Sequence, residues 1–257
     1  MHPKILTLDI ETAPIEAYVW SLWKQNVGLN QITTEWSLLS YAAKWLHKER
    51  VVYKDNRLQE DPRDDAGLME DLWNLLNDAD IVVAQNGLKF DLRKIRARFV
   101  LLGYPPFSPV KVVDTMLEAR KAFAFTSNKL EWLSAALTDE PKQKHKKFPG
   151  FELWSECLKH NRAAWNEMRA YNIVDVKGTE KVYLRIRPWI QGHPNITLYD
   201  DADAMRCPCC GSAQLEQDGY AYTQVGQYYR YVCECGAWSR SRYTINSLAK
   251  RKNTLSN

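Results

Sequence analysis

The chain has 257 residues with 35 basic and 31 acidic side chains, so its net charge of +4 is only mildly basic. This balance permits nucleic-acid binding without requiring it, and the length suits one good-sized domain plus a small one. No stretch approaches the roughly 18 consecutive apolar residues of a membrane span, and the N-terminus lacks the pattern of a secretory signal. We therefore expect a cytoplasmic protein without a membrane partner.

Apolar periodicity predicts alternating strands and helices along the first two thirds of the chain. The strands are expected at residues 4–10, at two places within 33–56 (the second at 50–54), at 81–84 and at 110–113. The helices are expected at residues 67–77, from 91 to 102, after a capping box of Asn128 and Glu131, and from about 162 to 185. Such alternation is typical of an α/β layered domain.

The domain organisation changes near residue 192. We expect residues 1–191 to form the α/β domain, and residues 192–204, with glycine, proline and acidic positions, to form a linker. Residues 205–257 combine aromatic and β-branched residues with paired cysteines and end in a basic tail. They are expected to form a small β-rich module.

Asp9 and Glu11 lie at the end of the first expected strand. Side chains two residues apart share one face of a strand, so these carboxylates point the same way. Two such carboxylates repel each other unless a cation lies between them, and Mg²⁺ or Mn²⁺ is a hard ion that prefers oxygen ligands. A solvated strand end is the alternative explanation of the pair.

Three further polar residues, on two of the expected helices, are candidates for a functional site. Asp91 begins the helix that follows strand 81–84, where an N-terminal cap is the simplest alternative role. Tyr171 and Asp175 are four residues apart and share one helix face, which also suits an ordinary surface pair. Asp has poor propensity in the middle of a helix, so its presence there needs a reason.

Taken together, the segments Asp-Ile-Glu, Asn-x-x-x-Phe-Asp and Tyr-x-x-x-Asp resemble the three motifs of the DnaQ-like 3′–5′ exonucleases, in the branch with a tyrosine in the last motif. The resemblance covers residues 4–190 and includes stand-alone exonucleases of phages and bacteria. It implies a ribonuclease-H-like mixed sheet flanked by helices. It also implies that Asp9, Glu11, Asp91 and Asp175 hold two Mg²⁺ or Mn²⁺ ions.

The same resemblance implies that Tyr171 orients the attacking water, and that Asn86 and Phe90 contact the terminal nucleotides. The expected activity is two-metal hydrolysis of DNA from a 3′ end, in a bacterial or phage-infected cell, with a polymerase or another replication protein as a possible partner. An exoribonuclease or an endonuclease of the same superfamily remains open, because discrimination of the 2′-hydroxyl depends on pocket shape. A non-catalytic adaptor is disfavoured, because it has no need of these residues.

Five of the six cysteines crowd into one late segment, as Cys207-Pro-Cys209-Cys210-Gly and Cys233-Glu-Cys235-Gly. In a reducing compartment, this spacing predicts metal binding and not disulfides. Four thiolates satisfy a structural Zn²⁺, and the module resembles a zinc ribbon. We expect Cys207, Cys210, Cys233 and Cys235 as ligands, with a Cys207/Cys209 pairing left open. The ribbon is expected to grip nucleic acid or to dock a protein.

A run of basic residues, Lys142–Lys147, lies between the two last expected helices. It suits either guidance of a nucleic-acid strand or a solvated loop.

Overall fold

The computed structural model describes residues 3–139, 145, 147–201 and 203–256, so most of the basic run Lys142–Lys147 lies outside the described residues. The chain divides into two compact units, Lys4–Tyr183 and Leu184–Asn257. No helix in the described part of the chain has both the length and the apolarity needed to cross a membrane.

The first unit alternates strands and helices as predicted. Its strands are β1 (Ile5–Thr12), β2 (Glu16–Ala17), β3 (Ile32–Thr34), β4 (Leu38–Trp45), β5 (Val52–Asp55), β6 (Ile81–Ala84) and β7 (Lys111–Asp114). Its helices are η1 (Leu29–Gln31), α1 (Ala66–Asp78), α2 (Asp91–Leu101), α3 (Thr115–Ala122), α4 (Leu130–Leu137), α5 (Glu152–Leu158) and α6 (Arg162–Ile186, which ends just beyond the boundary).

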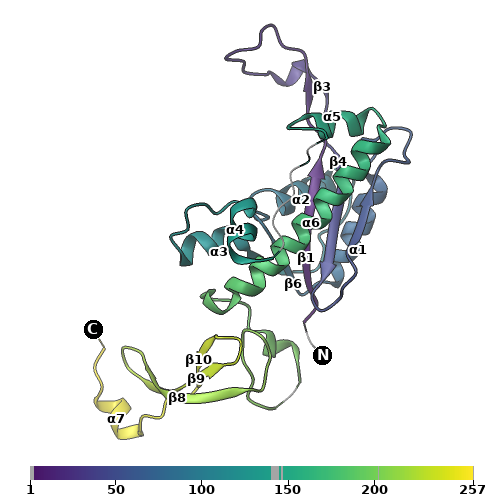
Figure 1. Cartoon of the computed structure of the whole chain (residues 1–257). Coiled ribbons are helices and arrows are strands. Elements are labelled where there is room, and N and C mark those ends of the chain that lie inside the picture. Colours follow the sequence, from purple (N-terminus) through teal and green to yellow (C-terminus); the bar gives the residue numbers. More distant parts are fainter. Residues whose placement is uncertain (1–2, 140–144, 146, 202, 257) are drawn as a thin grey trace. The chain divides into compact units, whose positions relative to one another are not determined.

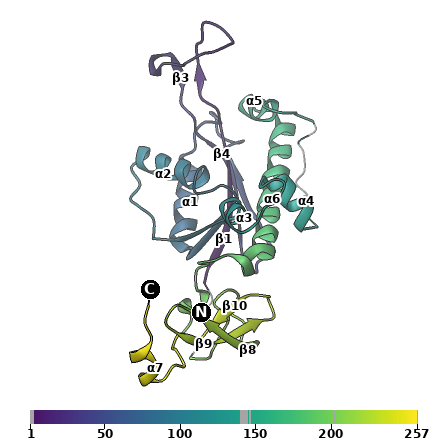
Figure 2. The same cartoon turned by 90° about the vertical axis from the view of Figure 1, so that its left-hand side faces the viewer.

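Five of these strands form one mixed sheet in the order β5-β4-β1-β6-β7. The central strand β1 pairs antiparallel with β4 and parallel with β6, which pairs parallel with β7. Figures 1 and 2 show α1 and α2 on one face of the sheet and α5 and α6 on the other. The predicted mixed sheet flanked by helices is therefore confirmed.

Alternation along β1 gives the sheet its two faces. Leu6, Leu8 and Ile10 are buried in a core that also holds Leu72 of α1 and Phe99 of α2. Burying one such side chain contributes about 1.5–3 kcal/mol. The odd-numbered residues of β1, including Asp9 and Glu11, therefore point to the opposite face, which α6 covers.

A buried core and an ion pair fix α6 on that face. Leu39 of β4 packs in one apolar cluster with Leu153 of α5 and Trp165 of α6. Further along α6, Glu180 accepts two hydrogen bonds from the Lys44 ammonium of β4, at 2.6 and 2.9 Å. Because both side chains are largely buried, this pair fixes the position of α6 more firmly than a surface pair would.

Some predicted details differ from the structure. Helix α4 has Lys129 at its N-cap position, so the expected capping box of Asn128 and Glu131 is wrong by one residue. Helices α3 and α5, of eight and seven residues, were not predicted from the sequence.

An arm of residues 15–31 leaves the sheet after β1 and returns through β3, and it projects away from the sheet in both views (Figures 1 and 2). Its tip carries large apolar side chains in solvent, with Trp20 at 96% and Trp23 at 81% exposure. These side chains contribute nothing to the core, so the arm does not stabilise the unit through burial.

The second unit is built on a three-stranded antiparallel sheet. Its elements are η2 (Arg187–Trp189), η3 (Ile196–Tyr199), β8 (Leu215–Tyr222), β9 (Gln227–Cys233), β10 (Trp238–Arg240) and α7 (Leu248–Asn253). Within the expected linker 192–204, Ile196 is buried and its N–H donates to the Pro208 carbonyl. The boundaries predicted for the two domains, 1–191 and 205–257, remain predictions.

Candidate active site

The loop between β6 and α2 brings the second motif to β1. The chain turns tightly after β6, where a Cβ at Gly87 would lie 2.4 Å from the Ala84 Cβ, so only glycine fits. Asn86 has a left-handed φ of 63°, which asparagine tolerates better than most residues. Helix α2 then begins at Asp91, whose Oδ1 accepts the Ile10 N–H at 3.1 Å. Asp91 is thereby bonded to the backbone between Asp9 and Glu11.

Asp114, at the end of β7, positions this same loop. Its carboxylate accepts the N–H groups of Asn86 at 3.0 Å and of Leu88 at 3.1 Å. It also caps α3 by accepting from Met116 and Leu117. No pattern in the sequence indicated the bonds to the loop, because these join residues 26 to 28 positions apart.

Helix α6 carries Tyr171, Asn172 and Asp175 to the face of the sheet where Asp9 lies. Asn172 is fully buried, and its Nδ2 donates to the carboxylate of Asp9. The Ser40 hydroxyl donates to Asn172 Oδ1 at 3.2 Å, which orients the amide with its NH₂ group toward Asp9. Asn172 was missed from the sequence, although an asparagine inside a helix has a poor propensity that could have marked it.

An aromatic cluster borders Glu11 and Tyr171. Trp154 of α5 donates from Nε1 to Glu11 Oε2 at 3.0 Å. The Trp154 ring meets that of Tyr171 edge-on, with centroids 6.4 Å apart, and His145 meets Tyr171 in the same manner at 5.3 Å. Trp154 therefore orients Glu11 and also limits the movement of the phenol. No pattern in the sequence marked this role of Trp154.

The five predicted residues meet in one cleft of about 370 Å³. The cleft is lined by Asp9, Ile10, Glu11, Gln85, Asn86, Phe90, Asp91, Met116, Lys129, Leu130, Glu131, Tyr171 and Asp175. The two predicted substrate contacts are thus also in the lining. Asn86 Oδ1 is buried without a hydrogen-bond partner among the described residues, and Phe90 is 38% exposed.

The electrostatics of the cleft favour a cation. Burial raises the pKa of Asp91 to about 7, with a smaller contribution from the nearby Asp114 charge, against the opposing effect of its backbone hydrogen bonds. Lys129 is the one basic residue in the lining, which holds five carboxylates in total. Carboxylate oxygens are the ligands that Mg²⁺ and Mn²⁺ prefer, so the donor set fits such ions.

The carboxylates are not drawn together as tightly as the thiols of the second unit. Among the described acidic, histidine and cysteine residues, the group with ligand atoms all within 4.8 Å is Cys207, Cys210, Cys233 and Cys235. Two ions about 3.5–4 Å apart need ligand atoms that are spread farther apart than the ligand atoms of a single ion. The wider spacing of the carboxylates is therefore compatible with two ions.

The four-cysteine group matches the geometry of a tetrahedral metal site. The Sγ atoms of Cys207 and Cys235 are 3.9 Å apart, and those of Cys210 and Cys233 are 3.5 Å apart. Zn–S bonds of about 2.3 Å in a tetrahedron place sulfurs about 3.8 Å apart. Cys209 is buried outside this group, and burial raises the pKa of its thiol to about 12. The described residues therefore bring together the four expected ligands and leave Cys209 aside.

Comparison with known proteins agrees with this architecture. A family model described as the RNase H superfamily matches residues 7–187, well over half of the chain. The chain belongs to the RNase H superfamily. Family membership and the acidic cleft together support a nuclease of this superfamily.

One similar solved structure is the family B DNA polymerase from the hyperthermophilic archaeon Pyrobaculum calidifontis. The match has 15% identity and a TM-score of 0.48, and it covers 72% of this chain and 25% of the polymerase. The chain thus spans about a quarter of that polymerase, and so weak a likeness bears on neither function nor partner. No curated protein matches the chain.

Proposed function

We propose that the chain is a metal-dependent 3′–5′ exonuclease that hydrolyses terminal phosphodiester bonds of DNA, on single strands or at 3′ ends. The observation that carries this proposal is the single cleft lined by Asp9, Glu11, Asp91, Tyr171 and Asp175. These residues come from β1, α2 and α6, which are far apart in the sequence. Their convergence in a chain of this superfamily supports a shared role in catalysis.

The four carboxylates are proposed to hold two Mg²⁺ or Mn²⁺ ions. When bound, such ions lower the pKa of a water and stabilise charge on the leaving 3′ oxygen. The protein's part is to keep the ligands in place before the substrate arrives. Asn172 and Ser40 orient Asp9, Trp154 orients Glu11, and the bond to Ile10 fixes Asp91.

Tyr171 is proposed to orient the attacking water by a hydrogen bond from its phenol. With a reference pKa near 10, the phenol is a poor base at neutral pH, so it contributes orientation more than deprotonation. The Phe90 ring is proposed to supply a stacking surface for the terminal nucleotides, and Asn86 is proposed to contact them from the lining of the same cleft.

The cysteine group of the second unit is proposed to hold one structural Zn²⁺. A three-stranded sheet of this size buries little apolar surface, so metal binding supplies much of its folding energy. We propose that this zinc ribbon grips the nucleic acid. Docking to a polymerase or another replication protein is the competing role.

The test is digestion of 5′-labelled DNA and RNA strands of the same sequence with Mg²⁺. We expect wild type to shorten the DNA stepwise, and Asp9→Ala to be inactive while its thermal unfolding and zinc content stay unchanged. Faster digestion of the RNA would favour the exoribonuclease, and internal cuts would favour the endonuclease. Wild-type activity in Asp9→Ala would refute the site itself.

A further inference from the structure

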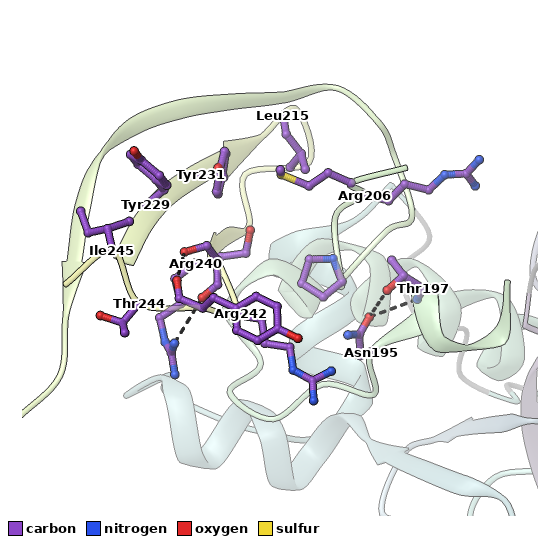
Figure 3. Close-up of a pocket in the computed structure, with 15 residues that line it drawn as sticks. Asn195, Thr197, Arg206, Leu215, Tyr229, Tyr231, Arg240, Arg242, Thr244 and Ile245 are labelled. Atoms are coloured by element: carbon purple, nitrogen blue, oxygen red, sulfur yellow. Dashed lines mark hydrogen bonds between the residues drawn. The ribbon is translucent and has the colours of Figure 1, made fainter. Parts of the chain in front are cut away.

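The second unit contains a pocket of about 530 Å³ that the proposed chemistry leaves without a role. Tyr229 and Tyr231 of β9 line it together with the segment Ser239–Ile245, as Figure 3 shows. Its remaining lining residues are Asn195, Thr197, Met205, Arg206, Pro208 and Leu215. The volume lies within the range of about 300–1,000 Å³ that small-ligand sites occupy.

The charge in this lining is of one sign. Its charged residues are Arg206, Arg240 and Arg242, and no lining residue is acidic. Arg206 is neutralised by Asp200 at 2.8 Å, and in Figure 3 its side chain extends away from the others. Among the described residues, neither Arg240 nor Arg242 forms an ion pair. Both arginines are exposed, so an anionic ligand can reach them and pair with their charges.

The strand register of the three-stranded sheet places two arginines opposite each other. Arg240 of β10 lies directly opposite Arg230 of β9, and like charges in that arrangement destabilise a sheet. Arg230 has a partner, because its Nε donates to the Asp218 carbonyl at 2.7 Å and its guanidinium lies 3.5 Å from the Asp218 carboxylate. Arg240 instead lies 4.0 Å from the ring centroid of Tyr228. The ring contact and a hydrogen bond from Arg240 Nη1 to the Ser241 carbonyl at 3.3 Å hold the guanidinium in place without neutralising its charge.

Flat and polar groups accompany the arginines. Tyr243 is 79% exposed and Tyr229 is 39% exposed, so both rings offer accessible faces. Ser239, Ser241 and Thr244 add hydroxyl groups to the lining. Aromatic faces beside arginines suit a base and its phosphate, since stacking contributes about 1–3 kcal/mol per base in single-strand binding.

We propose that this pocket binds one nucleotide unit of a single-stranded nucleic acid, with Arg240 and Arg242 on the phosphate and a tyrosine ring on the base. The inference rests on the proposed function in one respect, that the strand bound here is the nuclease substrate. A free nucleotide offers the same chemistry, so the experiment separates the two sources. An acidic protein segment is the alternative occupant.

The test measures anisotropy of a fluorescent single strand with the full chain carrying Asp9→Asn, which prevents digestion. We expect Arg240→Gln with Arg242→Gln to weaken binding about tenfold and to reduce the salt dependence of log Kd by about 1 to 2. The matched control, Arg251→Gln with Lys252→Gln on α7, removes the same charge outside the pocket and should change Kd less than threefold. Equal losses of affinity in both double variants would mean that total charge, and not the pocket, determines binding, and this would overturn the proposal.

Two competitors decide the occupant. If the pocket is built for a strand, an unlabelled oligonucleotide displaces the probe at far lower concentration than deoxythymidine monophosphate does. Equal potency per nucleotide would assign the pocket to free nucleotides. Binding of a labelled acidic peptide that depends on Arg240 and Arg242, without binding of the DNA probe, would overturn the proposal in favour of a protein partner.

A second measurement covers the case in which the double variant fails to fold. A strand carrying 5-iodouridine is photocrosslinked to the chain with intact arginines, and we expect the crosslink at Tyr229 or Tyr243. Crosslinks confined to residues outside the pocket would refute the proposal. Digestion by the active protein is followed in parallel. Pocket binding without digestion would support this inference and refute the proposed nuclease activity. Digestion without pocket binding would support the nuclease activity and refute this inference.

Discussion

Replacing Asp91 by asparagine should make the metal-free protein more stable at pH 8 while removing its activity. Asp91 is 3% exposed, and its Oδ1 accepts the Ile10 N–H. Asparagine has nearly the same shape and keeps that acceptor, so the substitution removes mainly the buried charge. We propose that a bound cation offsets the free-energy cost of burying this charge.

The magnitude follows from the pKa of Asp91, which burial raises from 3.8 to about 7. The folded protein therefore binds this proton more tightly than the unfolded chain does, and stability is lost as the pH rises from about 4 to 7. Each pKa unit corresponds to about 1.36 kcal/mol, so ionised Asp91 costs the metal-free fold about 4 kcal/mol above pH 7. Between pH 5 and pH 8 the loss is about 2–3 kcal/mol.

The assay is thermal unfolding of the full chain without added Mg²⁺, at pH 5 and pH 8. The Tm advantage of Asp91→Asn over wild type should grow by about 5–10 °C between the two pH values, and Mg²⁺ at pH 8 should raise the wild-type Tm much more than that of the variant. Glu70→Gln, at an exposed position of α1, is the control for loss of one negative charge. A Tm difference independent of pH, or equal Mg²⁺ effects in both proteins, would refute the reasoning.

Three further predictions concern the supporting residues. Asn172→Leu removes the donor to Asp9 and should lower kcat/KM about 10- to 100-fold in steady-state digestion, and a loss under twofold would deny the orienting role. Tyr171→Phe should lower kcat about 100-fold with little change in KM, whereas an unchanged kcat with a raised KM would make it a binding residue only. Cys210→Ser should lose the bound zinc measured by mass spectrometry and Cys209→Ser should keep it, and the reverse result would contradict the ligand assignment.

The chemistry of the cleft could be predicted from the sequence, because its residues follow local rules of strand and helix geometry. Asp9 and Glu11 share a strand face by alternation, and Tyr171 and Asp175 share a helix face by spacing. The loop that carries Asp91 was marked by the Asn-Gly pair before it. Joining these segments into one site required the resemblance to a known family, since no local rule relates residues so far apart.

The residues that support the cleft could not be predicted from the sequence, because they act through contacts between segments that are far apart in the chain. Trp154 meets Glu11 across 143 positions, and Asn172 meets Asp9 across 163. Asp114 caps α3, but it also accepts hydrogen bonds from the loop before Asp91, and no local rule predicts those bonds. The pocket with Arg240 was likewise hidden, because it depends on how one chain segment folds over a neighbouring strand.

The central claim is removal of nucleotides from a 3′ end, and comparison of a linear and a circular single strand of the same sequence tests it most directly. With Mg²⁺, the linear strand carrying a 5′ label should give a ladder of products that shorten one nucleotide at a time, while the circle, which has no end, stays intact. Opening of the circle, or release of the 5′ label as a mononucleotide before any ladder forms, would contradict the account.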